Sequence, residues 1–152
     1  MNVAVLFAGG IGSRMNAGSV PKQFLEIHGK PIIVHTLEVF ESHPDIDAIA
    51  ISILPQGRVE LEKLVRRFEI SKVRWIVDGG ATGQSSRHRA LQAVAQDSPP
   101  ETLVLIHDGV RPLVDHHLIS ENIRDAGERG NAITCTKINE SIGTSESDEI
   151  GE

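Results

Sequence analysis

The fold of this chain is decided by the stretch LFAGGIGSRM, residues 6–15, and by the segment PKQFL, residues 21–25, that follows it. Residues 2–7 are almost all apolar, which is typical of a strand buried on both faces of a parallel sheet. The glycines behind this strand predict a sharp turn, because glycine adopts backbone angles that are closed to other residues. We therefore expect a buried strand that runs directly into a glycine-rich loop.

The glycine-rich loop is predicted to bind a polyphosphate. Gly9, Gly10 and Gly12 allow main-chain N–H groups to approach an anion closely. Arg14 and Lys22 add two positive charges, the first as a planar fork and the second as a compact point charge. The alternative is that the glycines only make a tight strand-to-helix turn, and the two spaced cations argue against it.

Two commoner glycine motifs do not fit the loop. A dinucleotide-binding fingerprint would need a third glycine at the position of Met15. A phosphate-binding Walker loop would end in Gly-Lys-Ser/Thr, which does not follow here. The loop therefore predicts another kind of nucleotide site.

Strand-like and helix-like patterns alternate along the rest of the chain, which favours an α/β fold, Rossmann-like, with a mostly parallel sheet and helices on both faces. Ligands of such sheets bind beyond the carboxyl ends of the strands. The predicted strands are residues 2–7, 47–53, 73–77, 102–106 and 131–138; the predicted helices are residues 31–42, 59–68, one capped by Ser85 or Ser86, and one capped by Asp115 and ended by Gly127 or Gly130.

Asp108 is the candidate metal ligand. It follows the predicted strand 102–106, so its carboxylate should lie at the same edge of the sheet as the glycine loop. Mg²⁺ takes one or two protein carboxylates and completes its shell with water and substrate phosphates. The alternative is that Asp108 caps a turn and pairs with Arg111.

Composition indicates one cytoplasmic domain. The chain has 152 residues and 39% hydrophobic content, enough for a core. A net charge of −6 argues against nucleic acid as a partner, and no apolar run is long enough for membrane insertion. The single Cys135 fits a reducing compartment and is expected as a small buried residue of the last strand.

Several separated segments resemble the polyol-phosphate cytidylyltransferase family of nucleotidyltransferases. Besides the loop, the matching segments are GKPIIVHTL at residues 29–37, DGG at 78–80 with Ser86, and HDGVRP at 107–112. The resemblance implies transfer of CMP from CTP to a polyol phosphate with release of pyrophosphate. The loop and Val110 favour ribitol 5-phosphate as acceptor, with methylerythritol phosphate of isoprenoid synthesis as the alternative.

The family resemblance also implies roles for individual residues. Arg14 and Lys22 would be catalytic, Arg111 and Ser141 would contact the acceptor, and Asp108 would hold Mg²⁺. The implied nucleotide-binding residues are Ala8, Gly9, Gly10, Gly12, Ser13, Gly80 and Ser86.

The chain departs from the family pattern in two places. The family has an acidic residue and an Arg shortly after the two glycines, where this chain has Ala81, Thr82 and Gly83, and Arg87 is the candidate replacement. Near the end, Glu140-Ser141-Ile142 replaces an Asp-Thr pair.

We expect residues 1–142 to be the nucleotide-binding α/β domain and residues 143–152 to be an acidic tail or the start of a further segment. The family's C-terminal portion is not found, and full-length members are expected to be homodimers. A non-catalytic CTP-binding module or fragment is therefore the other alternative.

Overall fold

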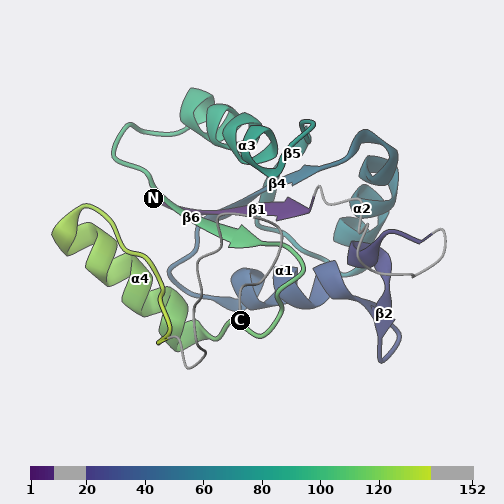
Figure 1. The fold of residues 1–152 in the computed structure, drawn as a ribbon, viewed down its shortest axis with the longest axis horizontal. Coiled ribbons are helices and arrows are strands. Elements are labelled where there is room, and N and C mark those ends of the chain that lie inside the picture. The colour runs from purple at the N-terminus through teal and green to yellow at the C-terminus, as the bar shows by residue number, and fades with distance from the viewer. Residues whose placement is uncertain (9–19, 138–152) are drawn as a thin grey trace, which may run out of the picture.

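The computed structural model describes residues 1–8 and 20–137 (Figure 1). A four-stranded parallel sheet in the order β5-β4-β1-β6 lies between helices. The prediction of an α/β fold with a parallel sheet is confirmed. The strands of this sheet are β1 (Asn2–Ala8), β4 (Ala48–Ile53), β5 (Val73–Asp78) and β6 (Leu103–Asp108); the helices are α1 (Ile32–Ser42), α2 (Pro55–Arg67), α3 (Gly83–Asp97) and α4 (His116–Arg129).

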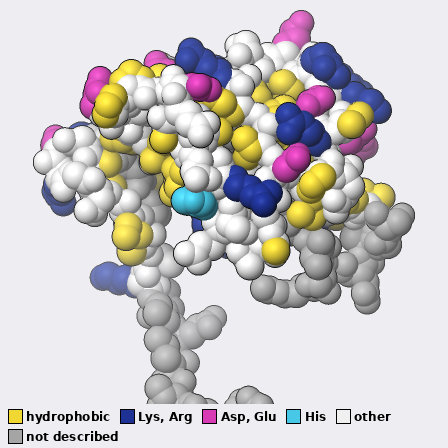
Figure 2. Space-filling model, turned by 90° about the horizontal axis from the view of Figure 1, so that it is seen from above, with side chains coloured by type: hydrophobic (Ala, Val, Ile, Leu, Met, Phe, Trp, Pro, Cys, Tyr) yellow, Lys and Arg dark blue, Asp and Glu magenta, His cyan; other side chains and the backbone are white. Residues whose placement is uncertain are grey.

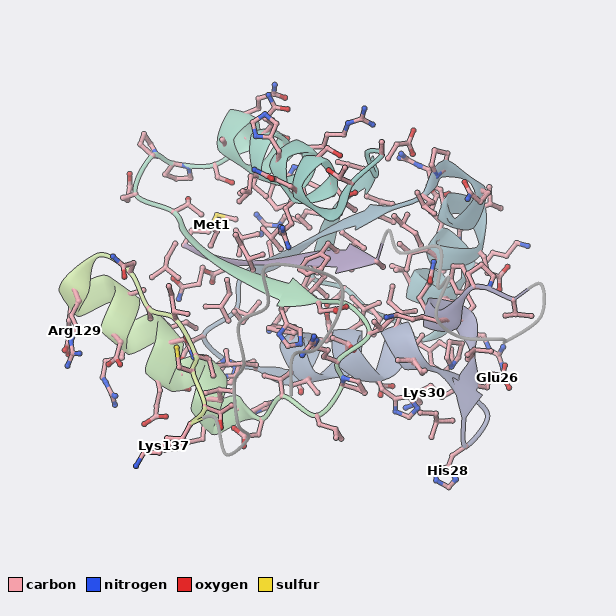
Figure 3. The ribbon with its side chains drawn as sticks, in the orientation of Figure 1. Met1, Glu26, His28, Lys30, Arg129 and Lys137 are labelled. Carbon is pink, nitrogen blue, oxygen red and sulfur yellow. The ribbon has the colours of Figure 1, made fainter. Side chains whose placement is uncertain are left out.

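A short connecting segment precedes α1. It contains the 3₁₀ helix η1 (Lys22–Phe24) and the antiparallel hairpin of β2 (Glu26–Ile27) and β3 (Lys30–Pro31). Figure 3 shows the hairpin projecting away from the sheet, with His28 at its tip. His28 and Gly29 have positive φ angles of 52° and 73°, which make this turn. The hairpin thus leaves η1, with Lys22, close to the sheet edge.

The helices cover the two faces of the sheet unequally. Helix α3 packs on one face, where Ala90 and Val94 meet Val3 and Val5 of β1. Helices α1, α2 and α4 share the opposite, larger core, which includes Phe40. Strands β1 and β4 are buried in the middle because the apolar runs that form them carry no polar face.

Strand β6 lies at the open edge of the sheet. Val104 and Ile106 point to the α3 side in register with Val3 and Val5, yet they are 36% and 49% exposed. Helix α3 contacts β1, β4 and β5 but leaves this part of β6 uncovered.

Three predictions about the elements are corrected by the structure. Residues 131–137 form no strand, and Cys135, which was expected to be buried there, is exposed. Thr134 bonds instead to Asn122 of α4 at 3.0 Å, so this stretch follows the helix rather than pairing with β6. The N-cap of α3 is Thr82, not Ser85 or Ser86, since Thr82 Oγ1 accepts from the backbone N–H of Ser85.

The ends of α4 agree with the sequence prediction. Asp115 caps α4 as predicted, and Gly130 ends it with a φ of 85°. His43 is fully buried between α1 and α4, where its Nε2 lies 3.1 Å from the carbonyl oxygen of His116. Among the residues described, no helix is both long and apolar enough to span a membrane.

Candidate nucleotide site

A cleft of about 280 Å³ opens at the carboxyl ends of β1 and β6, beside the N-terminus of α3. Four segments distant in sequence line it: the end of β1, η1, the turn that leads into α3, and the end of β6. The cleft brings together four predicted site residues, Ala8, Lys22, Ser86 and Asp108. This is where ligands of parallel α/β sheets bind.

Not every predicted site residue can be placed. Gly9, Gly10, Gly12, Ser13, Arg14 and Ser141 lie outside the described residues. Ala8, the last residue of β1, is buried at the cleft and marks the point from which residues 9–19 continue. Their assigned roles remain predictions.

The loop after β5 is held close to α3. Gly80 donates its backbone N–H to Ser86 Oγ at 3.0 Å, and Ser86 is only 1% exposed. A Cβ on Gly80 would overlap the side chain of Ser85, so glycine is required here for close packing of the loop on the helix. Gly80 and Ser86 thus bond to each other, and their role in nucleotide binding stays a prediction.

Ser86 keeps limited hydrogen-bonding capacity. Its hydroxyl donates to the carbonyl oxygen of Thr82 at 3.0 Å and accepts from Gly80. A serine hydroxyl has one donor and two acceptor positions, so the described residues leave one acceptor position of Ser86 unused.

Two arginines that were not among the predicted site residues also bond to this loop. Arg89 of α3 donates from Nη1 to the carbonyl oxygens of Asp78 and Gly79, at 3.2 and 3.1 Å. Arg58 of α2 donates to the carboxylate of Asp78 at 3.2 Å. These arginines come from two helices and are far apart in sequence, so no local pattern could have revealed them.

Arg87 does not replace the missing family arginine at the loop. Its guanidinium lies over the ring of Phe7, 4.9 Å from the centroid, a cation–π arrangement. Phe7 lines the cleft, so Arg87 lies next to the site and not beside Gly80.

Asp108 is the last residue of β6 and pairs in register with Phe7. Its Oδ1 accepts from the backbone N–H of Val110 at 3.0 Å, and its Oδ2 accepts from Arg111 Nε at 3.3 Å. Asp108 therefore caps the turn and pairs with Arg111, as the alternative interpretation predicted. Each carboxylate oxygen accepts about two hydrogen bonds, so the described residues use only one position on each.

The donor set at Asp108 fits Mg²⁺ with nucleotide phosphates as co-ligands. A single hard carboxylate at a cleft is enough for this ion when substrate and water complete the shell. Within residues 1–8 and 20–137 there is no cluster of three or more His, Cys, Asp or Glu side chains that would enclose a metal by protein alone. Such a cluster is not what a nucleotide-bound Mg²⁺ requires.

The charge around the site is mixed. On the α3 side of the molecule, Lys and Arg side chains are interspersed with Asp and Glu (Figure 2). Hydrogen bonds from Arg58 to Asp78, and then to Glu62, raise the pKa of Arg58. Among the described residues that line the cleft, the positively charged one is Lys22, which is half-buried.

The fold and this cleft define a nucleotidyltransferase-like α/β domain, and the comparisons with known proteins agree. The family described as IspD, 2-C-methyl-D-erythritol 4-phosphate cytidylyltransferase, matches residues 2–150. The chain belongs to this family, so the predicted family resemblance is confirmed.

Similar proteins are named for two different acceptors, ribitol 5-phosphate and 2-C-methyl-D-erythritol 4-phosphate. The ribitol-5-phosphate cytidylyltransferase of Streptococcus agalactiae serotype III is 45% identical over 142 residues, which cover 93% of this chain and 59% of the relative. The 2-C-methyl-D-erythritol 4-phosphate cytidylyltransferase of Geobacillus kaustophilus is 42% identical over 139 residues, which cover 91% of this chain and 59% of the relative. The chain spans about three fifths of the length of these relatives.

A solved structure shows the same fold. The 4-diphosphocytidyl-2C-methyl-D-erythritol synthase of Anaerococcus prevotii superposes with a TM-score of 0.74 at 26% identity. The match covers 97% of this chain and 60% of that structure.

Proposed function

We propose that this chain carries the CTP-binding site of a cytidylyltransferase that transfers CMP to a polyol phosphate, with ribitol 5-phosphate as the favoured acceptor. A phosphate oxygen of the acceptor attacks the α-phosphorus of CTP, a new P–O bond forms, and pyrophosphate leaves. The observation that carries the proposal is the cleft in which Ala8, Lys22, Ser86 and Asp108 meet from four separate segments. The favoured acceptor rests on the ribitol-named relative and on the sequence.

The residues of the cleft have distinct roles in this proposal. The N–H groups of the loop at residues 9–13 hold the β and γ phosphates, and Arg14 and Lys22 stabilise the charge that grows on the α-phosphate and on the departing pyrophosphate. No covalent intermediate with the protein is needed, so positioning and charge stabilisation supply the catalysis. Arg111, which is 77% exposed and paired with Asp108, orients this carboxylate or contacts the acceptor phosphate.

Asp108 holds Mg²⁺ in this proposal. When bound, the ion neutralises charge on the nucleotide phosphates. Asp108 itself stays fixed because Val110 and Arg111 hold its two oxygens in place.

Base selectivity is proposed to involve the loop after β5. The remaining acceptor position of Ser86 suits the amino group that cytosine presents, whereas a uracil-like base presents a carbonyl oxygen at that place. CTP is therefore favoured over UTP.

The test is CTP binding followed by turnover. Calorimetry with CTP, UTP and Mg²⁺ measures nucleotide binding, and release of pyrophosphate with ribitol 5-phosphate measures transfer. Binding of CTP in preference to UTP supports the site. No CTP binding refutes it, and binding without pyrophosphate release shows a nucleotide-binding module.

A second acceptor is supported by the relative from Geobacillus kaustophilus, whose name contains 2-C-methyl-D-erythritol 4-phosphate. The same pyrophosphate assay with both polyol phosphates distinguishes them. The homodimer expected of longer family members and the acceptor contact of Ser141 also stay predictions.

A further inference from the structure

The loop that follows β5 has a stem, Asp78–Gly80, and a tip, residues 81–83, that lines the cleft. The stem is bound on both sides. Gly79 donates its N–H to the carbonyl oxygen of Ile53 on β4 at 2.7 Å, and the Asp78 and Gly79 carbonyl oxygens both accept from Arg89. The stem is therefore fixed by a backbone hydrogen bond to β4 and by hydrogen bonds from the Arg89 side chain of α3.

The bonds of Arg89 and Ile53 depend on each other. The C=O of Asp78 and the N–H of Gly79 belong to one planar trans peptide, so they point in opposite directions. When Arg89 holds the oxygen toward α3, the N–H is turned toward Ile53. Loss of the Arg89 bonds lets this peptide rotate and weakens the bond on the other side.

We propose that Arg89 is a positioning residue for the base-recognition loop, and that it sets CTP affinity and selectivity without touching the nucleotide. This inference rests on the function proposed above. The family resemblance implies an arginine shortly after the two glycines, where this chain has Ala81, Thr82 and Gly83. Arg89 brings a positive charge to the loop from a position on α3 that is six residues after Gly83.

The expected effect is confined to the base side of the site. Lys22 and Asp108 come from η1 and β6, and the stem of the loop belongs to neither element. Binding of inorganic tripolyphosphate should therefore not depend on Arg89. A hydrogen bond from a charged group changes affinity by about tenfold, which corresponds to about 1.4 kcal/mol.

Three variants of the full 152-residue chain provide the test. Arg89→Met keeps an unbranched apolar side chain but has no donor. Arg89→Lys keeps a charged donor that can reach both carbonyl oxygens from one nitrogen, as Nη1 does. Arg124→Met on α4 is the matched control, because Arg124 is also an exposed helical arginine that donates two hydrogen bonds nearby, both to Oδ1 of Asp125. Helix α4 does not line the cleft.

We expect Arg89→Met to bind CTP about tenfold more weakly and to prefer CTP over UTP less, with tripolyphosphate affinity unchanged. Arg89→Lys should recover most of both losses, and Arg124→Met should behave as the parent. Parent-like CTP affinity and selectivity in Arg89→Met would overturn the proposal, and so would an equal loss of CTP and tripolyphosphate binding.

A measurement without nucleotide separates this inference from the proposed function. Amide hydrogen exchange of Gly79 should be faster in Arg89→Met than in the parent and the Arg124→Met control. Equal exchange rates would overturn the role of Arg89 even if the chain binds CTP. Faster exchange in a chain that binds no CTP would support the role of Arg89 in the loop and refute the proposed function instead.

Discussion

Replacing Gly80 by alanine tests whether the loop after β5 owes its shape to close packing on α3. Gly80 has no positive φ angle, so the substitution adds steric overlap without backbone strain. The new Cβ would lie 2.6 Å from Ser85 Cβ and 3.2 Å from the Ser85 backbone carbon, and it would overlap Ser85 Oγ. A rotation of the Ser85 hydroxyl cannot relieve the contacts with Cβ and the backbone.

The magnitude follows from two losses. Ser85 Oγ accepts the backbone N–H of Thr82 at 3.0 Å, which completes the capping box of α3. Loss of a cap costs about 1 kcal/mol, and overpacking costs a further 1 to 3 kcal/mol, roughly. We expect Gly80→Ala to lower the free energy of unfolding by about 2 to 4 kcal/mol, or the Tm by roughly 5 to 15 °C in a domain of this size.

Urea and thermal unfolding, followed by circular dichroism, measure this loss. Gly127→Ala in α4 is the control, because nothing lies within 4 Å of the added methyl group, and alanine should stabilise the helix by up to about 1 kcal/mol. A double-mutant cycle with Ser85→Gly should show that Gly80→Ala costs less when Ser85 has no side chain. If Gly80→Ala unfolds like the parent, or if the cycle shows no coupling, the packing argument is wrong.

Three further predictions concern Lys22, Asp108 and Glu41. Lys22→Ala should lower the rate of pyrophosphate release by about a hundredfold or more while weakening CTP binding far less; equal rates in rapid-quench assays would remove Lys22 from the mechanism. Asp108→Asn should abolish the dependence of CTP binding on Mg²⁺ in calorimetry, and an unchanged dependence would leave Asp108 as a turn cap only. Burial opposes ionisation of Glu41, but hydrogen bonds from Ser71 and Lys72 outweigh it and lower the pKa of this carboxylate. The ionised Glu41 should therefore stabilise the fold above the unfolded-state pKa of about 4.5, and this contribution should be lost as the pH falls through the lower folded-state pKa. Glu41→Gln should therefore be less stable than the parent at pH 7 and equally stable near pH 2, and a difference that persists at low pH would show that ionisation is not the cause.

The sequence predicted the parts of the fold that depend on local pattern. Continuous apolar runs identified β1 and β4 because both faces of these strands are buried. Asp115 and Gly130 marked the ends of α4 because capping is a local interaction. The four segments of the cleft were each found from their own motif.

Other features depend on contacts between distant segments, and the sequence did not reveal them. The stretch 131–137 alternates like a strand, but its Thr134 bonds to Asn122 of α4 instead. Arg89 and Arg58 belong to no sequence motif, because each bonds to a loop that is distant in sequence and is brought near it only by the fold. Thr82, Ser85 and Ser86 all lie near the start of α3, and only side-chain geometry showed that Thr82 is the cap.

The central position of β1 has a consequence for folding during synthesis. Asn2 pairs with Leu103, and the whole of β1 is held between β4 and β6. At ribosomal rates of about 5 to 20 residues per second, the apolar first strand emerges roughly 5 to 20 seconds before its last partner. During this time its hydrogen-bonding groups and aliphatic side chains are open to other chains, as is typical of slow parallel sheets. We therefore expect the yield of folded protein in cells to depend on chaperones that bind nascent chains.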